Sequence, residues 1–83
     1  MCTNIATTTR IAGSAKTARG WTAVDEATIG FDHATHLWTE HALRIDFTGA
    51  SDRAAVELDL ASARALRDRI DEAIAEAERE GVG

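Results

Sequence analysis

Residues 59–80 constrain the fold more than any other stretch, because their composition favours a long helix throughout. Asp59 is a residue type that caps helix N-termini, and the residues after it are strong helix formers. Acidic residues and arginines occupy most faces of this helix, and Gly81 is a stop signal. The remaining face is one narrow apolar stripe made of Ala63, Leu66, Ile70, Ala73, Ile74 and Ala77. The stripe predicts an amphipathic helix that packs against an apolar surface.

The chain before this helix has the residue pattern of β-strands. Residues 3–11 are rich in threonine and isoleucine and predict a first strand, whereas residues 12–20 are small and predict a loop. Three further segments alternate between apolar and polar residues and end in turns; they are residues 21–33, 41–48 and 53–58. Four strands followed by a helix predict an α+β fold, in which one helix packs on one face of an antiparallel sheet (ββββα).

This pattern fits one domain over residues 1–83, near the lower size limit for a chain that folds alone. Residues 1–2 are expected to be a terminus, 3–58 the sheet, 59–80 the helix and 81–83 a tail. Alanine supplies much of the apolar content, and Cys2 has no partner for a disulfide. Because one narrow helix covers only part of a four-stranded sheet, we expect a homodimer in which another chain covers the rest. Trp21 and Trp38 either make that contact or complete the core.

The charge excludes several classes of partner. Nine basic and fourteen acidic residues give a net charge of −5, and no basic stripe is present. Binding to a phosphate backbone requires clustered lysine and arginine, so we do not expect a nucleic-acid partner. No apolar run approaches the length of a membrane span, and no signal peptide is recognisable. A single thiol without export signals fits the cytoplasm.

All three histidines lie within the segment FDHATHLWTEH, residues 31–41. If residues 27–33 and 41–47 form a hairpin, strand alternation places His33 and His41 on the same face and at the same end of the sheet. His36 lies in the connecting turn, from which its ring could fold back. Because imidazole is the commonest metal ligand in proteins, we expect His33, His36 and His41 to bind a divalent ion, with zinc or iron ahead of copper or nickel.

Two acidic residues and the cysteine could complete such a site. Glu40 is preferred over Asp32 as a ligand or a catalytic base, because Asp32 has the wrong strand parity. Removal of Met1 would expose Cys2 with a thiolate and an α-amine, which together form a chelating pair. An open coordination position would allow metal-dependent chemistry on a small-molecule substrate.

Three alternatives remain open from the sequence. The histidines could form a cross-strand pair that binds nothing, or could serve a metal-free enzyme together with Cys2. The whole chain could instead be a non-catalytic interaction module, or an accessory subunit that docks on a larger enzyme through its sheet face.

Short motifs along nearly the full length carry a resemblance to a known family. They are Met1-Cys2-Thr3, Gly13-Ser14, Gly20-Trp21, Asp32-His33 with His36, Glu40-His41, Leu43, Ile45-Asp46-Phe47 and Ser62-Ala63. Through these motifs the chain resembles a family of short, uncharacterised actinobacterial proteins that open Met-Cys-Thr. The resemblance implies a compact standalone protein and no particular reaction. The resemblance also implies prolines in the turn that holds His36, whereas this chain has no proline.

Overall fold

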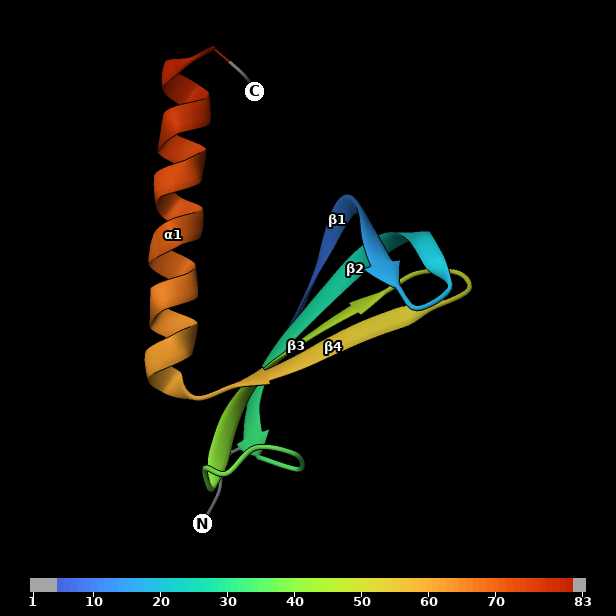
Figure 1. The fold of residues 1–83 in the computed structure, drawn as a ribbon, viewed down its shortest axis with the longest axis vertical. Coiled ribbons are helices and arrows are strands. Elements are labelled where there is room, and N and C mark those ends of the chain that lie inside the picture. The colour runs from blue at the N-terminus through green and yellow to red at the C-terminus, as the bar shows by residue number, and fades with distance from the viewer. Residues whose placement is uncertain (1–4, 82–83) are drawn as a thin grey trace.

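The computed structural model describes residues 5–81 and has the expected order of four strands and one helix (Figure 1). The elements are β1 (Ile5–Thr17), β2 (Gly20–His33), β3 (His41–Thr48), β4 (Arg53–Leu58) and α1 (Leu60–Arg79). All neighbouring strands are antiparallel, and the sheet order β1-β2-β3-β4 follows the chain. The α+β, ββββα prediction is therefore confirmed.

The register gathers the large apolar residues on one face of the sheet. Ile29 of β2 lies opposite Ile45 of β3, which lies opposite Val56 of β4. The next row of the same face consists of Phe31, Leu43 and Leu58. Because side chains alternate along a strand, Arg44 and Asp46 project from the other face.

The prediction of a loop over residues 12–20 was wrong. Residues 13–17 continue β1 and pair with β2, from Gly13 opposite Val24 to Thr17 opposite Gly20. A shift in register between Arg10 and Gly13 accommodates one extra residue in β1, as a β-bulge does. The actual turn is short, and Gly20 after it has a φ of 111°, which glycine adopts without strain. Small residues have low strand propensity by themselves, but here the partner strand supplies the backbone hydrogen bonds.

The turn between β3 and β4 closes tightly over β2 at Gly49. The Gly49 amide donates to the Asp52 carbonyl at 3.1 Å. A Cβ at position 49 would lie 2.1 Å from the carbonyl oxygen of Ala23, far inside van der Waals contact. Glycine is therefore required here by the approach of two backbones, which holds β2 against this turn.

Helix α1 begins one residue after β4. The side chain of Asp59 accepts a hydrogen bond from the Ser62 amide at 2.7 Å, which caps the helix as predicted. The helix ends at Arg79 with Glu80 as its C-cap, and Gly81 after the cap has a φ of 78° and donates its amide to the Glu78 carbonyl at 3.1 Å.

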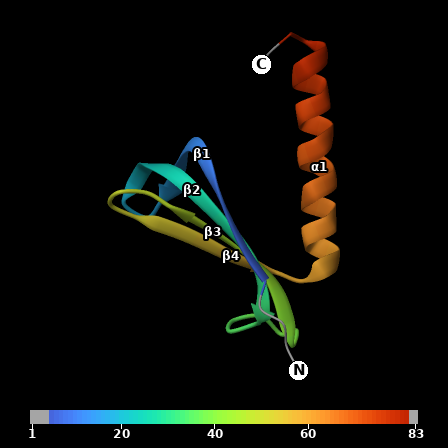
Figure 2. The same ribbon diagram turned by 180° about the vertical axis from the view of Figure 1, so that it is seen from behind.

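The packing of α1 differs from the expectation of a helix laid along the sheet. The helix contacts β3 and β4, but the two layers diverge from Asp59 in both views (Figures 1 and 2). Within α1, all of which the structure describes, no residue is buried. The stripe residues Ile70 and Ile74 are 50% and 51% exposed. The apolar stripe of α1 is thus present, but the sheet of the same chain covers only part of it.

The open arrangement leaves an unusually large surface. The chain exposes 6369 Å², where a compact chain of 8.9 kDa would expose about 4,800 Å². Its radius of gyration is 14.5 Å, against about 12 Å for a compact domain of this length. Among residues 6–81, the buried apolar residues are Val24, Ala27 and Ala42, all of them small or medium-sized. This thin core fits the large share of alanine in the apolar content of the sequence.

Candidate functional site

The histidine turn, residues 34–40, joins β2 to β3 at one end of the sheet. His33 lies directly opposite His41, as the predicted hairpin requires. Their rings stack with centroids 5.0 Å apart, and the His41 ring also stacks on Phe31 at 5.5 Å. The two imidazoles therefore lie on the apolar face of the sheet, which confirms their predicted placement at one end of that face.

His36 is held by a different set of groups, centred on the carboxylate of Glu57. That carboxylate accepts from the backbone amides of Thr35 and His36 at 3.2 and 2.9 Å. It also accepts from the Thr35 hydroxyl and from Arg44, both at 2.7 Å. Because Arg44 and Glu57 face each other on the polar face of the sheet, this network ties the turn to that face.

The structure therefore does not bring the three histidines together. His33 and His41 share the apolar face, whereas the backbone of His36 is bonded to a carboxylate of the opposite face. Over residues 5–81, no three histidine, cysteine, aspartate or glutamate residues form a group that could hold a metal ion.

The hydrogen bonds around Glu57 fix its charge. The bonds from Arg44, the Thr35 hydroxyl and the His36 amide lower the pKa of the Glu57 carboxyl from 4.5 to about 2. Glu57 is consequently ionised at neutral pH and only accepts hydrogen bonds, so the single hydroxyl proton of Thr35 is donated to it.

That donation determines the tautomer of His36. The Nδ1 atom of His36 lies 2.9 Å from Oγ1 of Thr35. Since the Thr35 proton is directed at Glu57, Nδ1 must be the donor in this bond. In the neutral ring, Nε2 then carries the lone pair. A carboxylate, a hydroxyl and a backbone amide thus orient an exposed imidazole, an arrangement that sequence reasoning missed.

The other predicted site residues have simpler surroundings. Glu40 is exposed, and its backbone carbonyl accepts from the Ala34 amide at 3.1 Å. The side chain of Asp32 accepts from the His33 amide at 2.7 Å. Cys2 lies outside the described residues. The strand order places β1 beside β2 at the histidine end of the sheet, with Ile5 opposite Phe31.

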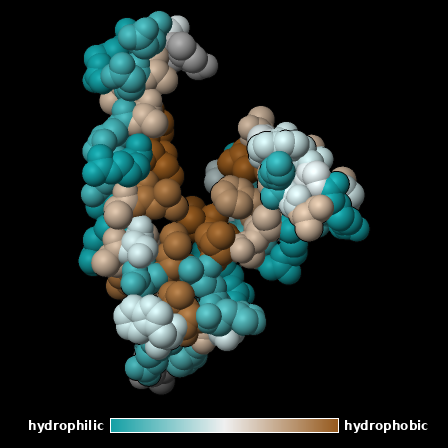
Figure 3. Space-filling view, viewed as in Figure 1, coloured by the Kyte–Doolittle hydropathy of each residue, from teal (hydrophilic) through white to brown (hydrophobic). Residues whose placement is uncertain are grey.

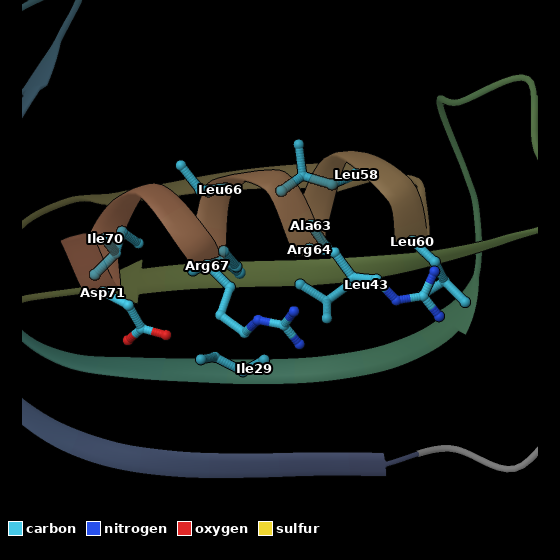
Figure 4. Close-up of a pocket in the computed structure, with 11 residues that line it drawn as sticks. Ile29, Leu43, Leu58, Leu60, Ala63, Arg64, Leu66, Arg67, Ile70 and Asp71 are labelled. Atoms are coloured by element: carbon cyan, nitrogen blue, oxygen red, sulfur yellow. The ribbon is translucent and has the colours of Figure 1, made fainter.

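The most distinctive feature of the surface is an apolar cleft between α1 and the sheet. Figure 3 shows apolar residues on both of its walls, and its volume is about 400 Å³. Arg64, Arg67 and Asp71 add charge along the helix side, as the close-up in Figure 4 shows. The apolar lining residues are Ile29, Leu43, Ile45, Leu58, Leu60, Ala63, Leu66 and Ile70. We refer to this feature as the apolar cleft.

The two tryptophans lie elsewhere. Trp21 is 70% exposed and Trp38 is 84% exposed, so neither completes the core of the single chain. Neither of them is among the residues that line the apolar cleft. A role in contact with another chain, the other alternative from the sequence, stays a prediction.

A family model described as a family of unknown function (DUF6295) matches residues 1–83. This match agrees with the resemblance to an uncharacterised family. No curated protein and no solved structure matches the chain. Within the described part of the chain, no helix is long and apolar enough to cross a membrane.

Proposed function

The chain belongs to this family of unknown function, and we propose that it is a protein-binding module whose apolar cleft docks an amphipathic helix. The proposal corresponds to the interaction module that the sequence left open as an alternative. We also propose that it acts in the cytoplasm, as its single cysteine suggests.

One observation carries the proposal: several large apolar residues that the sequence places at helical and strand spacing are only partly covered by the chain itself. Leu60 and Leu66 are 43% and 42% exposed on one wall, and Ile29 is 43% exposed on the other. Burial of such residues yields roughly 25 cal/mol per Å², so an uncovered cleft favours association. An apolar groove flanked by charged residues is the surface on which amphipathic helices dock.

The polar face of the sheet offers less to a partner, because its charges are already satisfied. Arg44 pairs with Glu57 at 2.7 Å, and Arg53 pairs with Asp46. The described side chains include no buried nitrogen or oxygen that lacks a hydrogen-bond partner. The apolar face is therefore the surface that gains more from contact with a partner.

Metal binding is the second candidate, and the stacked pair of His33 and His41 favours it. Two imidazoles on facing strands can provide two ligands, and Cys2 or a residue of another chain would have to complete the set. Zinc, iron, copper or nickel uptake that disappears in a His33→Ala/His41→Ala variant would support this candidate. Uptake that persists in that variant would contradict it.

The docking proposal can be tested with a synthetic peptide that copies residues 59–81. The peptide is titrated into the full-length protein, in which the methyl groups of Ile29 and Ile45 are observed by NMR. We expect saturable shifts of these methyl signals, and their loss with an Ile45→Asp variant. A Trp38→Ala variant, altered outside the cleft, should respond as the unmodified protein does. Absence of shifts up to the solubility limit, at protein concentrations at which the chain is monomeric, would refute the proposal.

A further inference from the structure

We propose that the occupant of the apolar cleft is a second copy of this chain, whose α1 lies antiparallel to the first α1. The inference rests on the proposed function and identifies the partner. The surface area, the charge distribution of the helix and the symmetry of the stripe support it independently.

The exposed apolar area matches what a dimer of this size needs. Leu60, Leu66, Ile70, Ile74 and Ile29 are each between 42% and 51% exposed, which leaves on the order of 450 Å² of apolar surface per chain. Two copies would cover about 900 Å². Since homodimer interfaces are about 65% apolar, the whole interface would be about 1,400 Å², within the range of stable complexes.

The charges of α1 are distributed unfavourably for an isolated helix. Residues 60–70 carry three arginines and one aspartate, whereas residues 71–80 carry five carboxylates and one arginine. The helix dipole favours the opposite arrangement, with acids near the N-terminus and basic residues near the C-terminus. An antiparallel partner removes this conflict, because the basic half of each helix then lies beside the acidic half of the other.

The charged residues beside the stripe are placed for such pairing. Arg64, Arg67, Asp71 and Glu78 follow one another at intervals of three, four and seven residues, which keeps them on one flank of the stripe. In an antiparallel pair, this flank of one helix lies beside the same flank of the second helix, which runs in the opposite direction. Arg67 then approaches Asp71 of the second copy, and Arg64 approaches Glu78 of the second copy.

Apart from Ala73, whose symmetry-related position is Arg67, the stripe is also self-complementary about Ile70. Leu66 and Ile74 lie four residues before and after Ile70, and Ala63 and Ala77 lie seven residues before and after it. A two-fold axis at Ile70 therefore places Leu66 of one helix against Ile74 of the other, and Ala63 against Ala77. Large residues meet large ones and small residues meet small ones, as an isologous interface requires.

The link between β4 and α1 disfavours closure of the cleft by the chain's own helix. Only Asp59 separates Leu58 from Leu60, and it has φ −70° and ψ 166°. The same residue caps the helix through its bond to the Ser62 amide. A large rotation of α1 onto its own sheet would have to change these dihedral angles and strain the cap. A second copy fills the cleft without that change.

The test measures self-association of the full-length chain by sedimentation equilibrium and native mass spectrometry. We expect a dimer of the unmodified protein that weakens as salt is added, because the antiparallel contacts join opposite charges. Variant Arg64→Glu/Arg67→Glu and variant Asp71→Arg/Glu78→Arg should each dimerise at least about tenfold more weakly. Mixed together, they should form a heterodimer as tight as the unmodified dimer.

The control is Glu72→Arg, which reverses a charge on the outward face of α1; Glu72 pairs with Arg69, which takes part in none of the proposed contacts. Its dimerisation should stay within about threefold of the unmodified value. Tight heterodimer formation in the mixture shows that each of the two doubly substituted variants is folded. A dimer that strengthens with added salt would overturn the antiparallel arrangement. A chain that is monomeric at every concentration, yet binds the peptide of residues 59–81, would overturn the second-copy inference and leave the proposed function standing.

Discussion

Truncation of Ile70 to alanine should weaken the dimer strongly while sparing the single chain. Ile70 is 50% exposed, so each copy offers about 100 Å² of this side chain to the interface, of which alanine would remove roughly two thirds. Over the two copies, the loss at 25 cal/mol per Å² is about 3 kcal/mol. That corresponds to an increase of roughly a hundredfold in the Kd of the dimer.

Sedimentation equilibrium over a range of concentrations measures this change directly. Alanine has a higher helix propensity than isoleucine, so loss of α1 would not be the cause of a weaker dimer. Glu72→Ala is the control, since it truncates a long side chain that is 63% exposed on the outward face of α1. If Ile70→Ala changed the Kd by less than about threefold, or no more than Glu72→Ala does, the placement of Ile70 at the centre of the interface would be wrong.

Three further predictions concern the sheet and the histidine turn. The pKa of Glu57 is lowered from 4.5 to about 2. The ionised Glu57 side chain therefore contributes fully to stability above about pH 4.5, and this contribution is lost as the pH falls toward 2. The free energy of unfolding of Glu57→Gln, measured with urea, should depend less on pH over that interval. Gly49→Ala places a methyl group 2.1 Å from the Ala23 carbonyl oxygen and should lower the free energy of unfolding by about 1–3 kcal/mol, whereas Gly13→Ala, with 3.7 Å to its nearest neighbour, should cost less. Nitrogen-15 NMR should find neutral His36 protonated at Nδ1, and a Thr35→Val variant should lose that preference; an unchanged tautomer in the variant would contradict the role of Thr35.

The elements that could be predicted were those whose residues repeat with the period of their structure. The alternation in residues 41–48 and the helical spacing after Asp59 correspond to β3 and α1 nearly to the residue. Residues 12–17 have no such period, because alanine, glycine and serine carry little preference. Their strand exists through its pairing with β2, a contact that local sequence does not encode.

The candidate site was predictable to the same extent. Strand alternation placed His33 and His41 on one face, and the assumed hairpin placed them at one end of the sheet; the structure pairs them directly. His36 lies in a turn, where no period applies, and its position depends on a bond to Glu57, twenty-one residues away. The sequence feature that could have identified Glu57 was its negative charge on the strand that faces the positive charge of Arg44. The angle between α1 and the sheet, which creates the apolar cleft, depends on the dihedral angles of Asp59 and leaves no trace in the pattern.

The two faces of the sheet show why association should involve one of them. On the polar face, Glu57 collects hydrogen bonds from Arg44 and the histidine turn, so the chain satisfies this face by itself. On the apolar face, the chain provides a stripe and a sheet surface that only partly cover each other. A sequence selected to fold as a single chain would gain by replacing half-exposed isoleucines with polar residues, because exposed apolar surface promotes aggregation. The presence of Ile29, Leu66 and Ile70, each at least 42% exposed, in one cleft is therefore best explained by a structure that becomes complete only when a second chain is bound.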